Sequence, residues 1–337
     1  MWSNLTNAGC AINKNAASLA MKSPDMHILP DDVSGHASAA SILGSGGLVA
    51  FPTETVYGLG ADARNDDAVA RIYAAKGRPS FNPLIVHFAQ LDAVHQHVVW
   101  SDVAHTLAQA FWPGPLTLVL PKAPKSDVSQ LVTAGLDTLA VRMPAHPTAR
   151  AVLQAYGGPV AAPSANRSGQ ISPTRAHHVV QGLGDRIDAV VDGGNCDVGV
   201  ESTIVGLTDR PVLLRPGGIP EEALVKALGR PIAVRKKADG ISAPGQLSSH
   251  YAPSARMRLN ATEWEPGEAR LGFGDVNCDL NLSPSKDLME AASHLFDYLH
   301  KLDAAGAQTI AVSPIPHHGL GVAINDRLSR AAAPREG

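Results

Sequence analysis

The 337-residue sequence has few cysteines, few aromatic residues and no long apolar run. Its three cysteines, Cys10, Cys196 and Cys278, are odd in number and far apart, and none belongs to a Cys-x-x-Cys or Cys/His cluster. This pattern argues against a disulfide framework and a structural zinc site, and it favours a reducing compartment. Because the apolar runs are short and interrupted, we expect no transmembrane helix, and we interpret the protein as cytoplasmic, without membrane contact.

A large excess of positive charge is missing too. The formal net charge is -3 and aromatic residues make up 4% of the chain, which argues against a broad basic surface with stacking platforms for nucleic acid. A local positive pocket for a polyanion such as ATP is compatible with these values. The generic nucleotide motifs are also absent: there is no Gly-x-x-x-x-Gly-Lys-Ser/Thr loop, and the glycines at 44–47 precede a strand, the wrong order for a dinucleotide fingerprint.

The length favours two domains, and the apolar pattern places them. Residues 1–27 are expected to be a disordered N-terminal extension, and 28–225 interleave strand and helix patterns, as in an α/β or α+β domain. Residues 226–254 are rich in Gly and Pro and predict a linker, and 255–337 predict a small parallel-sheet domain. Helices are expected at 31–45, 66–76, 103–111, 147–155, 174–182, 287–305 and 325–332. Strands are expected at 48–51, 84–88, 116–120, 139–142, 160–162, 189–192, 202–207, 212–215, 269–273 and 309–312.

Irregular polar segments follow several of these elements. The end of one expected helix and the segment after it contain Lys76, Arg78 and Asn82. Two cations with an amide suit a triphosphate, because lysine supplies a point charge and arginine a fixed fork of donors. The same cations could merely complement the dipole of the helix. Ser164 and Asn166 follow an apolar strand, where such donors can converge on an oxyanion or simply form a turn.

Arg142 lies inside an expected apolar strand. A guanidinium buried there must pair with an anion. That anion could be a ligand or a structural carboxylate, and the sequence leaves both interpretations open.

In their order, these segments resemble the YrdC-like domain of the threonylcarbamoyl-AMP synthase family. The resemblance rests on PTETVYGLG at 52–60, KGRP and NPLIVH across 76–87, FWPGPLTLVL at 111–120, VRMP at 141–144, APSAN at 162–166, SPT at 172–174, ESTIV at 201–205 and LRPG at 214–217. SHYAP at 249–253 and GLGVAINDRLSRAA at 319–332 resemble the two-domain form of the family.

The resemblance implies an α/β fold with a mixed, twisted sheet, flanking helices and a concave cavity, followed by a smaller Rossmann-like parallel domain. It implies a nucleotidyltransferase, an L-threonylcarbamoyladenylate synthase, that condenses L-threonine, bicarbonate and ATP, with Mg²⁺, into threonylcarbamoyl-AMP and pyrophosphate. The product would serve modification of the tRNA adenosine next to the anticodon, through a downstream threonylcarbamoyl-transferase complex and a weak tRNA contact.

Residue roles are likewise implied by the resemblance. The Lys-x-Arg and Ser-x-Asn tetrad that lines the nucleotide site in the family falls on Lys76, Arg78, Ser164 and Asn166. The implied ATP contacts are Arg78, Asn82, Thr138, Ser164, Ser172, Arg215 and Tyr251. The implied threonine contacts are Thr55, His87, Arg142, Ala162 and Ser202. No protein ligand to a metal is implied, and we interpret His87 as a neutral hydrogen-bond donor in preference to a general base.

Two other functions compete with this interpretation. Binding of double-stranded RNA is disfavoured by the acidic net charge, and carbamoyl transfer in hydrogenase maturation by the absence of zinc-finger cysteines. One further hypothesis concerns the linker, which ends in the aromatic Tyr251. We expect it to act as a lid that excludes water from hydrolysable intermediates, with Tyr251 reaching back to the nucleotide.

Overall fold

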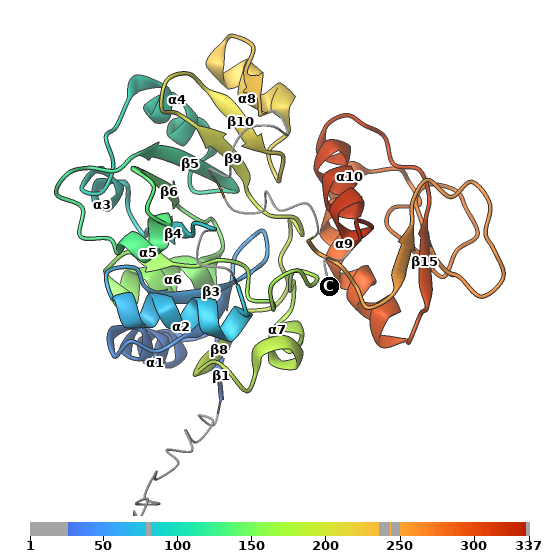
Figure 1. The fold of residues 1–337 in the computed structure, drawn as a ribbon, viewed down its shortest axis with the longest axis horizontal. Helices are drawn as coiled ribbons and strands as arrows, with labels where there is room; N and C mark the ends of the chain where they lie inside the picture. Colours follow the sequence, from blue (N-terminus) through green and yellow to red (C-terminus); the bar gives the residue numbers. More distant parts are fainter. Residues whose placement is uncertain (1–25, 79–81, 236–242, 244–249, 335–337) are drawn as a thin grey trace, which may run out of the picture.

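A computed structural model describes residues 26–78, 82–235, 243 and 250–334. The expected extension therefore lies outside the described residues up to residue 25, as do 236–242 and 244–249 of the expected linker. Figure 1 shows a large unit, coloured blue to yellow, and a smaller orange and red unit beside it. No helix in the described ranges is long and apolar enough to cross a membrane.

The large unit is built on a mixed sheet with strand order β1-β8-β2-β3-β7-β4-β6-β5-β9-β10-β11. Its strands are β1 (His27–Pro30), β2 (Val49–Pro52), β3 (Tyr57–Asp62), β4 (Ile85–His87), β5 (Leu116–Pro121), β6 (Thr138–Arg142), β7 (Val160–Ala161), β8 (Ala189–Asp192), β9 (Thr203–Gly206), β10 (Val212–Arg215) and β11 (Ala233–Val234). Its helices are α1 (Val33–Gly44), α2 (Asp66–Lys76), α3 (Leu91–His95), α4 (Asp102–Phe111), α5 (Gln130–Thr133), α6 (Pro147–Tyr156), α7 (Ala176–Leu183) and α8 (Glu221–Leu228). The expected mixed α/β architecture is confirmed.

Helix α2 shows how local sequence places a functional segment. The side chain of Asn65 accepts a hydrogen bond from the backbone N–H of Ala68, which caps the helix at its start. Gly77 ends the helix in the left-handed region, at φ 59°, a conformation that costs glycine little. Lys76 therefore occupies the last turn, and Arg78 leaves the helix in a new direction.

Several elements of the large unit were not expected from the sequence, among them β1, α3 and α5. Residues 57–62, which no expected helix or strand includes, form β3, which pairs antiparallel with β2. Helix α8 and strand β11 continue the regular structure past residue 225, into the range that was expected to be a linker. Strand β11 extends the sheet by pairing with β10. The glycine that suggested a linker there, Gly229, is the left-handed cap of α8, at φ 64°.

The small unit has a four-stranded sheet of order β12-β15-β13-β14, in which every pair is parallel, as expected. Its elements are β12 (Arg256–Arg258), β13 (Ala269–Gly272), β14 (Leu280–Asn281), α9 (Leu288–Ala304), β15 (Thr309–Val312) and α10 (Leu320–Ala331). Helix α10 begins five residues earlier than the expected start at 325. The core of this unit is continuous with Val56, Ile171 and Val200 of the large unit, so apolar packing joins the two.

Candidate active site

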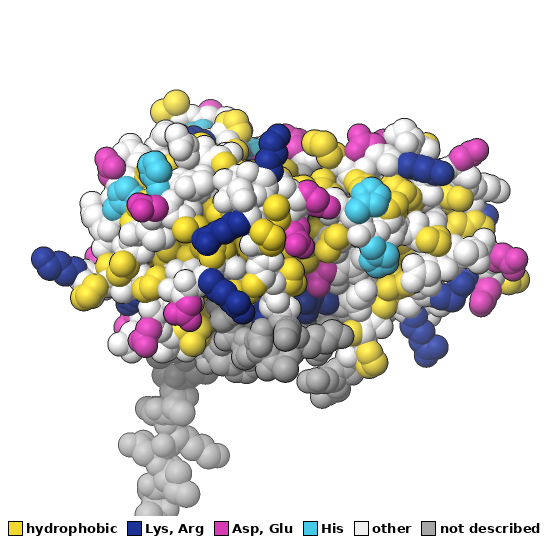
Figure 2. Space-filling model, turned by 90° about the horizontal axis from the view of Figure 1, so that it is seen from above, with side chains coloured by type: hydrophobic (Ala, Val, Ile, Leu, Met, Phe, Trp, Pro, Cys, Tyr) yellow, Lys and Arg dark blue, Asp and Glu magenta, His cyan; other side chains and the backbone are white. Residues whose placement is uncertain are grey.

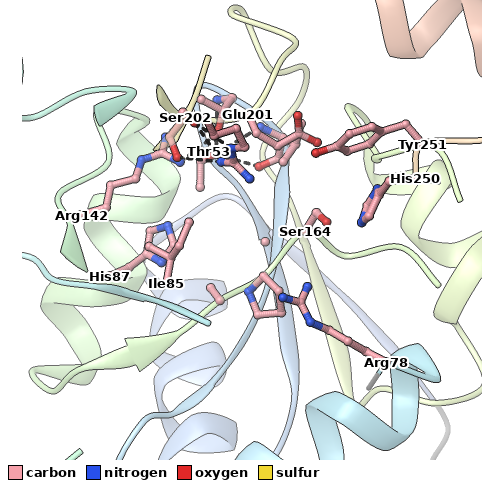
Figure 3. A pocket seen from close by; sticks show the side chains of 16 residues that line it. Thr53, Arg78, Ile85, His87, Arg142, Ser164, Glu201, Ser202, His250 and Tyr251 are labelled. Atoms are coloured by element: carbon pink, nitrogen blue, oxygen red, sulfur yellow. Dashed lines mark hydrogen bonds between the residues drawn. The ribbon is translucent and has the colours of Figure 1, made fainter. Parts of the chain in front are cut away.

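A pocket opens on the face of the large unit that is turned toward the small unit (Figure 3). In the close-up, Arg142 and His87 lie at one end, His250 and Tyr251 at the other, and Ser164 between them. The residues that line it are Thr53, Thr55, Val56, Gly58, Arg78, Ile85, His87, Arg142, Ala162, Pro163, Ser164, Glu201, Ser202, Arg215, His250 and Tyr251.

The sheet brings the first end of the pocket together. Strands β4 and β6 are parallel, and their last residues, His87 and Arg142, are register partners. Because the carboxyl ends of parallel strands meet at one edge of a sheet, both side chains reach the same pocket. The β2–β3 turn adds Thr55, and Thr53 holds this turn through a hydroxyl that donates to the Val56 carbonyl over 2.7 Å.

Arg142 is buried and pairs with a carboxylate of the protein. Its Nη2 donates to Glu54 Oε1 over 2.6 Å, Nη1 to Thr55 Oγ1 over 3.0 Å and Nε to the Gly114 carbonyl over 3.3 Å. Glu54 in turn accepts from the backbone N–H of Ala145. The structural carboxylate that the sequence left open therefore exists. A guanidinium has five N–H donors, so these three bonds leave Arg142 able to receive a further anion.

His87 faces the pocket in a neutral state. Burial, followed by the charge of Arg142, lowers the pKa of His87 to about 3. Its buried Nδ1 has no hydrogen-bond partner among the described residues. A neutral imidazole with an unused ring nitrogen suits a hydrogen bond to a polar ligand.

Ser202 and Arg215 form the adjoining wall. Arg215 donates from Nε and Nη2 to the Ser202 carbonyl, over 3.2 and 2.8 Å, and from Nη2 to Ser202 Oγ over 3.2 Å. The Ser202 hydroxyl also shares a hydrogen bond of 2.7 Å with that of Thr117. All five residues for which the resemblance implies a threonine contact line the pocket.

Two residues of the Lys-x-Arg and Ser-x-Asn tetrad lie in the pocket wall, and the other two lie outside it. Arg78 and Ser164 line the pocket, whereas Lys76 and Asn166 lie behind it. The ammonium group of Lys76 donates to the backbone carbonyls of Ser164 and Asn166, and so ties the end of α2 to that loop. Burial, together with the nearby charge of Arg78, lowers the pKa of Lys76 well below its ordinary value.

Several polar atoms on the nucleotide side have no hydrogen-bond partner in the described part of the chain. They are Arg78 Nε, Asn82 Oδ1, Asn166 Oδ1 and His250 Nδ1, and each is buried. Burial lowers the pKa of Arg78 to about 10, so the guanidinium still carries its charge at neutral pH. Buried polar groups are normally paired, so this cluster indicates a site prepared for a polar ligand.

Three predicted ATP contacts lie outside the pocket wall. Asn82 is buried beside Arg78, whose Nη2 donates to the Asn82 carbonyl over 3.3 Å. Thr138 begins β6, at the opposite end of the strand from Arg142. Ser172 is fully buried.

Among the wall residues without a role assigned from the sequence, two have ionisable side chains, Glu201 and His250. The Ser172 hydroxyl donates to Glu201 Oε1, and Arg327 of the small unit donates to Glu201 Oε2 over 2.8 Å. Both residues lie inside motifs already noticed, ESTIV and SHYAP, but the partners of the Glu201 side chain come from distant segments.

Tyr251 lies in the wall, as the lid hypothesis requires, with only 1% of its surface exposed. It adopts a left-handed backbone conformation, at φ 64°, which is uncommon for a bulky residue and is found mostly where the surroundings enforce it. Its ring packs against that of Phe296 of the small unit, with the ring centroids 5.6 Å apart. The free space in the pocket is about 50 Å³, whereas small-molecule sites typically span about 300–1,000 Å³. A ligand of that size would fit only if the walls moved apart.

The described residues provide no ready metal centre. They contain no group of three or more His, Cys, Asp or Glu side chains that could hold a metal ion. Glu54 and Glu201 are each engaged in an ion pair with a buried arginine. A Mg²⁺ ion in this pocket would therefore be held mainly by phosphate and water oxygens, which suits its chemistry.

Two family models match the chain. One, described as telomere recombination, matches residues 41–217, and the other, described as the C-terminal domain of threonylcarbamoyl-AMP synthase, matches residues 219–333. Threonylcarbamoyl-AMP synthase of Pyrococcus abyssi is 43% identical over 322 residues, which cover 88% of this chain and 94% of the relative. The Bacillus subtilis protein of the same name is 44% identical over 89% of this chain and 93% of its own length.

A shorter protein of that name, from Halorhodospira halophila, is 41% identical over 181 residues, 53% of this chain and 88% of its own length. Among solved structures, that of Pyrococcus abyssi Sua5 complexed with L-threonine superposes with a TM-score of 0.84 at 39% identity. It covers 91% of this chain and 97% of its own.

Proposed function

This chain belongs to the threonylcarbamoyl-AMP synthase family, and from that premise we propose that it condenses L-threonine, bicarbonate and ATP into threonylcarbamoyl-AMP and pyrophosphate. The observation that carries the proposal is the convergence of two kinds of group in one pocket. Arg142 and a neutral His87 occupy one end, and Arg78, Ser164 and Arg215 line the rest. The first set suits a small zwitterion, and the second suits a polyphosphate.

Threonine binding is assigned to the end of the pocket near Arg142. The donors that Arg142 does not use for Glu54, Thr55 and Gly114 would receive the threonine carboxylate. His87 would share a hydrogen bond with a polar group of threonine through its unpartnered Nδ1. A relative of this chain has been solved with L-threonine bound, which supports the choice of amino acid.

The nucleotide is assigned to the wall that Arg78, Ser164, Arg215 and Tyr251 share. Lys76 supports this wall from behind through the backbone carbonyls of Ser164 and Asn166, and holds the loop in place. We assign Mg²⁺ to the complex with ATP, where it would neutralise charge on the phosphates.

The reaction follows from this placement. Bicarbonate releases carbon dioxide and hydroxide, and the neutral threonine amine attacks the carbon dioxide. The proton that the nitrogen loses combines with the hydroxide to give water, which leaves an N-carboxylate. A carboxylate oxygen then attacks the α-phosphorus of ATP, the bond to the bridging oxygen breaks, and pyrophosphate leaves. With its pKa near 3, His87 is unprotonated and hydrogen-bonds in the neutral form. Catalysis then rests on positioning and on charge stabilisation by the arginines.

The product would pass to a transferase complex that modifies tRNA, with at most a weak tRNA contact by this chain itself. Binding of double-stranded RNA as the main function is not supported by the face of the molecule that Figure 2 shows. The face in Figure 2 mixes Lys and Arg side chains with Asp and Glu side chains, without a continuous basic tract.

One assay tests the proposal directly. The purified protein is incubated with labelled ATP, threonine, bicarbonate and Mg²⁺, and threonylcarbamoyl-AMP and pyrophosphate are measured with each component omitted in turn. We expect product only in the complete mixture. Pyrophosphate release that is independent of threonine, or salt-sensitive RNA binding without any adduct, would contradict the proposal.

A further inference from the structure

Arg327 belongs to the small unit and contacts two residues of the pocket wall, Glu201 and Tyr251, from outside the pocket. It lies on α10, and its side chain is completely buried. Its Nε donates to Glu201 Oε2 over 2.8 Å, and its Nη1 donates to the Pro216 carbonyl over 2.8 Å. The guanidinium also lies over the Tyr251 ring, with Cζ 5.4 Å from the ring centroid. Arg327 therefore contacts three separate segments around the pocket.

Its partner Glu201 is an unusual residue for this place. A carboxylate lines the same pocket as Arg78 and Arg215, the cations assigned to the nucleotide. Burial alone would raise the pKa of Glu201, but the charges of Arg327 and then Arg215 hold it below its ordinary value, so the carboxylate is ionised. An ionised carboxylate in a phosphate site repels the ligand unless a cation compensates it.

The geometry also shows what this carboxylate does. Glu201 Oε1 accepts the hydrogen bond of the Ser172 hydroxyl, and Oε2 accepts that of Arg327. The bond from Arg327 keeps Glu201 turned toward Ser172. If Arg327 lost its charge, Arg215 would remain as a cation that stabilises the ionised form of Glu201. Glu201 would then compete with the phosphates for that arginine.

We propose that Arg327 is a positioning residue through which the small unit completes the nucleotide site: it neutralises Glu201 and orients it toward Ser172, leaving the cations of the pocket to the phosphates. The inference rests on the proposed function for the identity of the nucleotide. It gives the small unit a definite role in binding ATP, although none of its described residues from β12 to α10 lines the pocket.

The test is a double-mutant cycle in the full chain, with the variants Arg327→Gln, Glu201→Gln and the combination of both. Pyrophosphate release is measured against ATP at saturating threonine and bicarbonate, and ATP binding is measured by calorimetry. Loss of a buried charge-assisted bond should raise the KM for ATP of Arg327→Gln at least about tenfold, with a smaller change in kcat. In the double variant the Glu201 charge is gone, and Asp326, the other carboxylate paired with Arg327, keeps its ion pair with Arg330, so the KM should return to that of Glu201→Gln.

A role confined to packing predicts different results. Removing the Glu201 charge would not then restore ATP binding, and the effects of the two substitutions would simply add. Additive effects, or an unchanged KM for ATP in Arg327→Gln, overturn the proposal. Arg270→Gln is the matched control, because it removes an arginine paired with Asp279 on the surface of the same unit, and it should leave the KM for ATP unchanged.

Two further comparisons keep the test decisive. If Arg327→Gln does not fold, the double variant and Glu201→Gln are compared directly, and a difference of about tenfold or more in KM for ATP overturns the proposal. If the wild-type chain makes no threonine adduct, the proposed function fails. The calorimetric cycle with ATP alone still confirms or overturns the role of Arg327.

Discussion

Replacing Arg142 by alanine removes a guanidinium with two kinds of partner, groups of the protein and the threonine carboxylate of the proposed complex. The two losses can be measured separately, as stability and as ligand affinity. The side chain of Arg142 is 4% exposed, and its guanidinium binds Glu54, Thr55 and the Gly114 carbonyl. In the proposed complex it also binds the threonine carboxylate. We therefore expect Arg142→Ala to weaken threonine binding much more than ATP binding, and to lower the free energy of unfolding as well.

The magnitudes follow from burial. Losing a charge-assisted contact to a buried carboxylate costs about 2–5 kcal/mol, which weakens threonine binding by more than about tenfold. Removing one partner of a buried ion pair costs about 3–5 kcal/mol in stability. We expect the lower end of that range, because Glu54 keeps a 3.0 Å hydrogen bond from the Ala145 N–H. ATP binding should change by less than about threefold, a difference of roughly 0.6 kcal/mol.

Calorimetric titrations of threonine and of ATP, together with urea unfolding, measure all three quantities. Arg71→Ala is the matched control: Arg71 pairs with Asp188 in the same unit over 2.8 Å, but its side chain is 43% exposed. That substitution should cost at most about 1 kcal/mol in stability and leave both ligands unaffected. Equal weakening of threonine and ATP binding, or no weakening of either, refutes the assignment of Arg142 to the carboxylate.

Three further predictions concern the remaining parts of the site. Lys76→Ala should lower both the ATP affinity and the melting temperature, because it leaves two buried carbonyls without a donor. Ser164→Ala should lower the ATP affinity with little change in the melting temperature. Equal melting temperatures for the two variants would contradict the supporting role of Lys76. The pKa of His87 is about 3 in the folded chain and about 6.5 in the unfolded chain. Between these pH values the unfolded chain binds more protons than the folded chain. The free energy of unfolding should therefore fall as the pH drops from 6.5 to 3. His87→Gln should flatten that dependence in urea titrations at several pH values, and an unchanged slope would argue against a buried neutral ring. Chelation of Mg²⁺ should abolish adduct formation and leave thermal unfolding of the ligand-free chain unchanged, since no described residues form a metal centre.

Sequence predicted most of the long, strongly patterned elements and missed several short ones. The helix expected at 66–76 matches α2 residue for residue, and the strand expected at 212–215 matches β10. Strand β11 has two residues, too few for a period-two pattern to be recognised, and β1 was missed at the boundary with the expected N-terminal extension. Residues 57–62 are dominated by small residues and glycines, so nothing local predicts that they pair as β3.

The sequence predicted site residues where the reactive groups lie together in one short motif. It could not predict them where the role of a residue depends on an ion pair with a side chain far away in the sequence. Arg142 was visible as a cation in an apolar strand, but its partner Glu54 is 88 residues away. Glu201 and Arg327 are 126 residues apart and belong to different units. Charge alone would allow many other ion pairs for these residues, and only the fold determines which pairs form.

These pairings bear on what the small unit contributes. Ser172 is held from two directions by that unit: His300 forms a 3.2 Å hydrogen bond with its carbonyl, and Arg327 holds Glu201, which accepts from its hydroxyl. Nearby, Arg175 forms a 2.7 Å ion pair with Asp297 of α9. A shorter relative, matched over 53% of this chain and 88% of its own length, carries the same enzyme name. In the proposed complex the small unit serves ATP binding: it seats the segment that begins at Ser172 and neutralises a carboxylate that would otherwise oppose the phosphates.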